Sequence, residues 1–216
     1  MDPALLVANH ISWLETIAIG SIFPTRFLAK NELRRWPLIG SLTALSGTLF
    51  IHRGSRRALQ RSQTTISQAL SEGQRVMVFP EGTTTDGSSV GRFRPALFET
   101  ARSAGCPIQP IAISYRSAQR SDPIAPYIDD DKFVPHLWRV LKRGNTHVHL
   151  HFCQPLHSRE TRQTLADICQ ARISLAVSNF PQTMRVATPS TTQIDPSQES
   201  STPPWPHLSK TAGRHD

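Results

Sequence analysis

Short apolar runs alternate with longer amphipathic stretches over residues 3–155. Runs rich in β-branched and aromatic residues and bounded by turn residues are typical of strands, whereas apolar positions three and four apart are typical of helices. Strands are predicted over residues 4–8, 27–29, 48–51, 75–79, 108–115 and 147–152.

Helix signals lie between and after these strands. Ser55 is a predicted N-cap of a helix that Gly73 ends, and Pro95 begins a helix that Gly105 ends. Further helices are predicted over residues 37–45, 133–141 and 161–180. The alternation predicts the α/β fold class, as a single domain whose mixed, mostly parallel central sheet is covered by helices.

Composition divides the chain at about residue 185. A chain of 216 residues with 38% hydrophobic content supports one such domain, over residues 1–185. Residues 186–216 are rich in Pro, Ser and Thr, so we expect a disordered tail. The tail carries two basic and three acidic side chains against +8 for the whole chain, so residues 1–185 carry +9. This charge indicates an anionic partner: nucleic acid, a phospholipid surface, a phosphorylated metabolite or an acidic carrier protein.

The remaining composition favours a reducing, cytosolic setting. Cys106, Cys153 and Cys169 are odd in number and form no CxxC pair, so we interpret them as small core residues. The longest uncharged run, residues 36–51, is shorter than the ~18 residues of a spanning helix, and no signal peptide follows Met1.

An imidazole and a carboxylate lie five positions apart directly after the first predicted strand. His10 and Glu15 fall in the segment NHISWLE, where the strand gives way to a loop. Loops at strand ends often carry catalytic groups, and a histidine beside an acid can act as a general base. Nine histidines in the chain make a chance pairing of this kind common.

Cationic side chains follow the strand over residues 48–51. Arg53 and Arg56 flank the predicted N-cap Ser55, and a helix N-terminus with guanidinium groups favours phosphate. A solvated basic helix start explains the same residues.

A polar loop follows the strand over residues 75–79. In this loop Gly82 allows close approach of a ligand, while Glu81 and Thr83 offer hydrogen bonds to hydroxyl groups. Arg94 precedes the helix at Pro95 and is a second candidate for phosphate. A plain turn is the alternative interpretation of this loop.

Three further clusters have both a structural and a functional interpretation. His147, His149 and His151 share one strand face, which fits a metal site less well than a polar outer face. The acidic run over residues 129–131 fits the start of the following helix. The tryptophans at positions 13, 36 and 138 are interpreted as packing or interface residues.

Four blocks together carry a resemblance to a known family. NHISWLE, GTLFIHRGSR, FPEGTTTDG and PIQPIAISY occur in this order over residues 9–115. They resemble the sequence blocks of the glycerolipid acyltransferases, specifically the bacterial 1-acylglycerol-3-phosphate acyltransferases. The resemblance extends more loosely to about residue 155.

The resemblance implies acyl transfer from acyl-CoA or acyl carrier protein to the sn-2 hydroxyl of 1-acylglycerol 3-phosphate, which gives phosphatidic acid. His10 would take the proton of the hydroxyl, which would attack the thioester directly, and Glu15 would orient the imidazole. The glycerol phosphate would bind Arg53, Glu81, Gly82 and Thr83, with help from Arg56, Arg94 and Lys30. No metal, no other cofactor and no nucleic acid are implied.

The chain departs from the family pattern at several positions. Glu15 and His52 stand where aspartate is usual, and Ala96 stands where glycine is common. Few residues precede the first block, so we expect an acyltransferase domain without the usual N-terminal membrane helix. Peripheral docking on the anionic cytoplasmic face of the inner membrane is expected instead.

Other functions remain open from the sequence. Related enzymes acylate lyso-ornithine lipid or glycerol 3-phosphate, and a catalytically silent lipid-binding module would fit the departures. A nucleic-acid-binding protein fits the charge alone and ranks last.

Overall fold

The computed structural model describes residues 2–30, 48–51, 55–117, 120–128 and 130–179. These residues belong to a unit that spans Met1–Met184. The helix predicted from Pro37 and the tail predicted from residue 186 lie outside the described residues, so both stay predictions, as does the boundary at residue 185.

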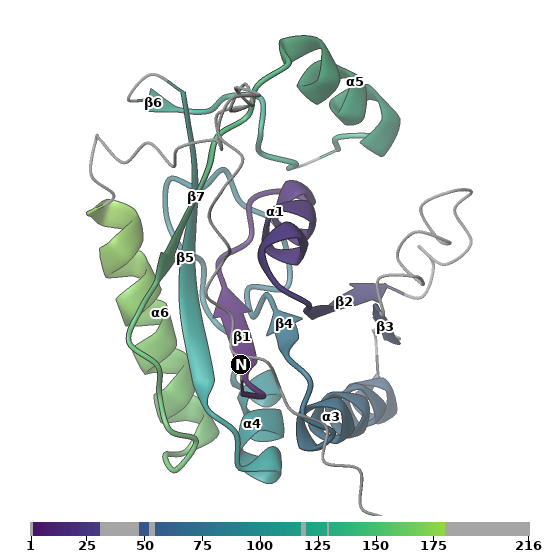
Figure 1. The fold of residues 1–216 in the computed structure, drawn as a ribbon, viewed down its shortest axis with the longest axis vertical. Coiled ribbons are helices and arrows are strands. Elements are labelled where there is room, and N and C mark those ends of the chain that lie inside the picture. The colour runs from purple at the N-terminus through teal and green to yellow at the C-terminus, as the bar shows by residue number, and fades with distance from the viewer. Residues whose placement is uncertain (1, 31–47, 52–54, 118–119, 129, 180–216) are drawn as a thin grey trace, which may run out of the picture. The chain divides into compact units, whose positions relative to one another are not determined.

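Among the described residues, seven strands form one sheet, in the order β3-β2-β4-β1-β5-β6, with β7 also paired to β5 (Figure 1). The strands are β1 (Leu5–Ala8), β2 (Arg26–Lys30), β3 (Leu49–Ile51), β4 (Val76–Val78), β5 (Ile108–Ser117), β6 (Arg120–Ser121) and β7 (Val148–Phe152). The first five run parallel, whereas β6 and β7 run antiparallel to β5. The predicted mixed, mostly parallel sheet is confirmed.

Helices lie between these strands and after the last one. They are α1 (Leu14–Ile22), α3 (Arg56–Ser71), α4 (Phe98–Ala104) after the 3-10 turn η2 (Pro95–Leu97), α5 (Phe133–Arg143) and α6 (Arg162–Ser178). Ser55 caps α3 as predicted, because its hydroxyl accepts from the N–H of Ala58. Gly105 ends α4 in the left-handed conformation, with φ of +63°.

Helix α1 was not predicted from the sequence. Its N-cap, Trp13, makes no side-chain capping bond, so the usual start signal is missing. The segment LETIAIGSI also contains β-branched residues and a glycine, which are weak helix formers. Tertiary packing compensates, because Ile19 is fully buried against the sheet.

The two faces of the sheet build two apolar clusters. Leu5 and Val7 of β1 point to a cluster that α3, α4 and α6 cover, whereas Leu6 and Ala8 point to a cluster that α1 covers. All four side chains are at most 3% exposed, so β1 is buried on both faces. This burial fixes the position of the segment that follows β1, in which His10 lies.

No helix within the described ranges has both the length and the apolar character that crossing a bilayer demands. The cysteines fit the interpretation as core residues in part: Cys106 and Cys169 are buried, and Cys153 is half-buried.

The buried thiols are expected to be unreactive in the folded protein. Burial raises the pKa of Cys169 to about 12, so at pH 8 only about one molecule in 10⁴ carries the reactive thiolate. A variant that keeps only this thiol (Cys106→Ala with Cys153→Ala) should react with a disulfide reagent at least about 100-fold faster in urea than when folded. Equal rates in the two states would contradict the buried position.

Candidate active site

The loops that carry the predicted site leave the sheet at one edge. β1 and β4 are parallel neighbours, with Val7 opposite Val78, so the segments after them emerge side by side. The last residue of β2, Lys30, lies opposite Ile51 of β3, so these two strands also end at this edge. The carboxyl ends of parallel strands are the usual place for ligands in α/β folds.

Glu15 lies in the first turn of α1 with no exposure to solvent. Its Oε2 is 2.9 Å from Nδ1 of His10, and its Oε1 accepts from the N–H groups of Ile11 at 2.9 Å and Ser12 at 2.6 Å. An ionised carboxylate can only accept hydrogen bonds, so the proton of the imidazole lies on Nδ1. Nε2 of His10 is then the basic ring nitrogen.

The imidazole is also held by packing. The ring of His10 stacks on the ring of Phe79, with centroids 4.1 Å apart and planes 14° from parallel. The side chain keeps 22% of its surface exposed, whereas its carboxylate partner keeps none. A base with a fixed tautomer, a fixed ring plane and access to solvent is suited to remove a proton from a bound hydroxyl group.

The main chain of His10 is tied to the loop that follows β4. Its N–H donates to Oε1 of Glu81 at 2.8 Å, and its carbonyl accepts from the N–H of Thr85 at 2.8 Å. Oε2 of Glu81 accepts from the N–H of Gly91, also at 2.8 Å. Burial raises the pKa of Glu81 above its ordinary value, and the bonds from His10 and Gly91 oppose that rise.

Asn9 joins this assembly to β5. Its side-chain Nδ2 donates to the carbonyl of Ile113 at 2.9 Å, and its Oδ1 accepts from the N–H of the same residue at 2.8 Å. The residue is fully buried, so both bonds replace water. Neither this pairing nor the Gly91 contact was predicted. The first joins strands distant in sequence, and the second depends on how the loop after β4 folds back on itself.

Two predicted phosphate ligands lie together. A Cβ built on Gly82, whose φ is +77°, would lie 3.0 Å from Cζ of Arg94, so the guanidinium covers this glycine. The N–H of Arg94 also donates to the carbonyl of Pro80 at 3.0 Å. Arg94 and Thr83 are exposed, as ligands for a solvent-borne anion must be.

The structure does not describe the side chains of three other predicted phosphate ligands. Arg53 lies outside the described residues. Lys30 ends β2 and Arg56 begins α3, and the side chains of both lie outside the description. Five of the nine predicted site residues, His10, Glu15, Glu81, Gly82 and Arg94, are thus given contacts by the structure.

A buried histidine supports the turn between His10 and Glu15 from outside. Nε1 of Trp13 donates to Nδ1 of His136 at 3.0 Å, so Nε2 of His136 donates to the carbonyl of Pro126, also 3.0 Å away. His136 is fully buried and belongs to α5. Trp13 also packs on Phe133 of that helix, with ring centroids 5.2 Å apart, in line with its interpretation as a packing residue.

The histidine cluster of β7 lies apart from this assembly, on the strand beyond β5. Over the residues that the structure describes, no three His, Cys, Asp or Glu side chains are arranged to hold a metal ion. Asp131 pairs with Arg139 of α5 at 2.6 Å, so it is tied to that helix as well as preceding it.

Comparison with known proteins gives consistent matches. A model of the Acyltransferase family matches residues 1–114. A lyso-ornithine lipid O-acyltransferase from Pseudomonas aeruginosa is 41% identical over 177 residues, which are 82% of this chain and 68% of that protein. A 1-acyl-sn-glycerol-3-phosphate acyltransferase from Neisseria meningitidis is 30% identical over 82% of this chain and 71% of its own length.

A solved structure agrees in fold. The 1-acyl-sn-glycerophosphate acyltransferase PlsC from Thermotoga maritima superposes with a TM-score of 0.59 at 21% identity. The match covers 83% of this chain and 66% of that one, so this chain spans somewhat less than two thirds of that protein. At this identity the likeness supports the fold alone.

Gly91 is expected to be intolerant of a side chain. A Cβ there would lie 2.7 Å from Oε2 of Glu81, closer than real contacts allow, so Gly91→Ala must displace the buried carboxylate. We expect a loss of about 1–3 kcal/mol in the free energy of unfolding, measured with urea. Gly20→Ala serves as the control, because a Cβ on Gly20 would lie at an ordinary 3.6 Å from the ring of Phe27. Gly20 lies within α1, where alanine is the better helix former, so the free energy of unfolding should be equal or up to about 1 kcal/mol higher. Equal stability of the Gly91 variant and the wild type would contradict the contact.

Proposed function

The chain belongs to the Acyltransferase family, and from this premise we propose that it transfers an acyl group from a thioester to the free hydroxyl of a lysolipid. The observation that carries the proposal is the hydrogen bond between His10 and the fully buried Glu15. That bond directs the basic Nε2 of the imidazole away from the carboxylate.

The proposed reaction has one covalent step. Nε2 of His10 takes the proton of the lysolipid hydroxyl while the hydroxyl oxygen attacks the thioester carbonyl. The C–O bond forms, the C–S bond breaks, and the leaving thiolate receives the proton from the imidazolium. The protein then returns to its starting state without a covalent acyl intermediate.

Two carboxylates act as positioning residues in this proposal. Glu15 fixes the tautomer and stabilises the imidazolium ion, as the acid does in other histidine-based sites. Glu81 holds the main chain of His10 through its N–H, so it sets where the base stands. Both oxygens of Glu81 already accept hydrogen bonds from main-chain N–H groups. This favours a positioning role for Glu81 over a role as a substrate ligand alone.

The acceptor has two candidates. Lyso-ornithine lipid is favoured by the Pseudomonas relative, whereas 1-acylglycerol 3-phosphate is favoured by the Neisseria relative. An ornithine headgroup carries a carboxylate and an amine where the glycerol lipid carries a phosphate. The guanidinium of Arg94 beside Gly82 would bind either anion.

The donor in this proposal is acyl-CoA or acyl carrier protein, and no further cofactor or metal is required. Both donors are anionic, which suits the charge of +9 that residues 1–185 carry. The same charge favours peripheral binding of the protein to the cytoplasmic face of the inner membrane, where the lysolipid resides.

Loss of the base is expected to slow transfer strongly. His10→Ala should lower kcat by about 10²–10⁴-fold, because general base catalysis contributes that much. Glu15→Gln should lower kcat strongly with little change in KM, because Glu15 contacts the base. The assay follows thiol release from acyl-CoA and the ester product by mass spectrometry. His157→Ala, at an exposed histidine, should behave like the wild type.

The same assay identifies the acceptor. Lyso-ornithine lipid, 1-acylglycerol 3-phosphate and glycerol 3-phosphate are supplied in turn with acyl-CoA or acylated carrier protein. We expect His10-dependent product with one of the two lysolipids. Product formed by His10→Ala at the wild-type rate would disprove the mechanism, and vesicle binding without turnover of any pair would favour a silent lipid-binding module.

A further inference from the structure

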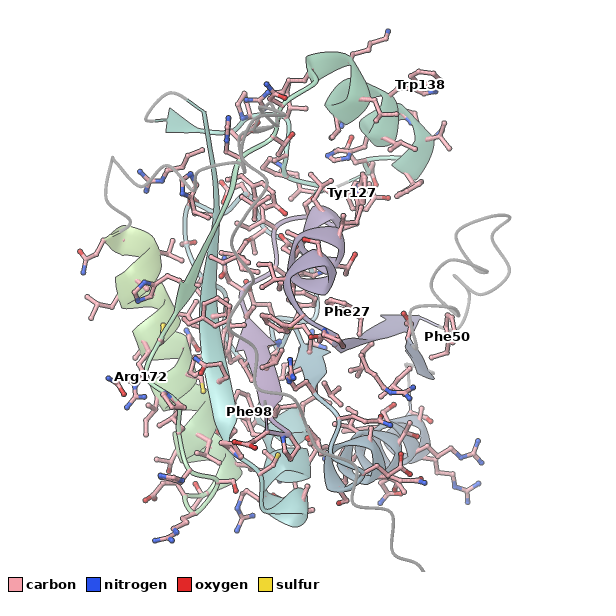
Figure 2. The ribbon with its side chains drawn as sticks, in the orientation of Figure 1. Phe27, Phe50, Phe98, Tyr127, Trp138 and Arg172 are labelled. Carbon is pink, nitrogen blue, oxygen red and sulfur yellow. The ribbon has the colours of Figure 1, made fainter. Side chains whose placement is uncertain are left out.

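Helix α5 turns a stripe of large apolar side chains outward. Val134, Trp138 and Leu141 are four and three positions apart, so they project from one side of the helix. They are 60%, 59% and 59% exposed, respectively. Figure 2 shows Trp138 pointing outward from α5. The outer side of a surface helix in a globular protein usually carries polar side chains, so this exposed apolar stripe departs from the usual pattern.

The opposite side of α5, which carries Phe133, His136 and Arg143, makes the contacts with the rest of the domain. His136 is buried between Trp13 and the carbonyl of Pro126, and Arg143 pairs with the fully buried Asp122. Asp122 also accepts from the N–H groups of Ile124 and Ala125, so the ion pair is well supported. These contacts fix the rotation of the helix and keep the apolar stripe outside.

Cations flank the stripe. The eleven residues of α5, all of them described, include no acidic side chain. Lys142 within the helix and Lys132 at its N-cap are exposed. Arg139 is 46% exposed and paired with Asp131. Lysine stems can lie along an apolar surface while their ammonium groups stay among polar groups.

This combination matches one occupant in particular. Short amphipathic helices with Trp and Leu on one face and Lys or Arg beside it lie in the plane of a membrane interface. Tryptophan prefers that depth, and the ammonium groups match anionic headgroups. The choice of lipid over a protein partner rests on the proposed function, since a lysolipid acceptor resides in the bilayer.

We propose that α5 is an interfacial helix that seats the domain on an anionic phospholipid bilayer. Val134, Trp138 and Leu141 enter the headgroup region, and Lys132 and Lys142 contact lipid phosphates. Because His136 holds Trp13, which lies between His10 and Glu15 in sequence, the seated helix also brings the catalytic turn to the bilayer surface.

Vesicle sedimentation tests this surface without any acyl donor. The full chain is mixed with vesicles of phosphatidylcholine, alone or with phosphatidylglycerol. The triple variant Val134→Ser, Trp138→Ser, Leu141→Ser should bind the mixed vesicles on the order of 100-fold more weakly than the wild type. The matched control Leu59→Ser with Leu175→Ser removes apolar groups that are 40% and 64% exposed on α3 and α6, and it should bind like the wild type.

A second variant tests the charges separately. Lys132→Gln with Lys142→Gln should weaken binding to the mixed vesicles about tenfold and leave binding to pure phosphatidylcholine unchanged. This pair also serves if the triple variant does not fold, which circular dichroism would reveal. Unchanged binding by a folded triple variant, or by the lysine variant, would overturn the proposal.

Two outcomes separate this proposal from its alternatives. If the wild type sediments with vesicles through α5 but shows no transfer with any acceptor, the proposed function fails and the docking surface stands. Light scattering could instead show that the wild type is a dimer and the triple variant a monomer, while the triple variant still binds vesicles. The stripe would then be covered by a second copy of the chain, and the membrane proposal would be wrong.

Discussion

The carboxylate of Glu15 is removed from solvent completely, and such a charge is tolerated only where hydrogen-bond donors surround it. Three donors meet it here: Nδ1 of His10 and the N–H groups of Ile11 and Ser12. To present all three, the chain must turn sharply between the end of β1 and the start of α1. The conformation of this turn, the tautomer of the base and the position of α1 therefore follow from one buried charge.

The sequence allowed prediction of the elements that local patterns encode. Six of the seven described strands, the Ser55 cap and the pairing of His10 with Glu15 depend on residues at most a few positions apart, whereas the two-residue strand β6 was not predicted. Contacts between loops could not be predicted from the sequence. The hydrogen bond from His10 to Glu81, for example, requires that β1 lie beside β4. Helix α1 lacks a capping side chain, and α5 carries large apolar side chains on its outer side as well. Neither the presence of the first helix nor the orientation of the second could therefore be derived.

The side chain of Glu15, which is longer than that of aspartate, still forms the hydrogen bond to the imidazole. Glutamate stands at position 15 where the resemblance leads one to expect aspartate, so its carboxylate is one methylene farther from the main chain. The carboxylate nevertheless reaches 2.9 Å from the imidazole while its second oxygen binds two main-chain N–H groups. The extra methylene lies within the buried first turn of α1, so the variation is absorbed without exposing the charge.

The central place of β1 also bears on how the chain folds. It is the earliest of the described strands, yet its two neighbours, β4 and β5, come about 70 and about 100 residues later. Long-range parallel pairing closes large loops and is slow. During synthesis the apolar segment LLVA therefore emerges well before either partner, and it stays exposed to aggregation or to chaperones until β5 is made. The strand that positions the base is thus among the last to become protected.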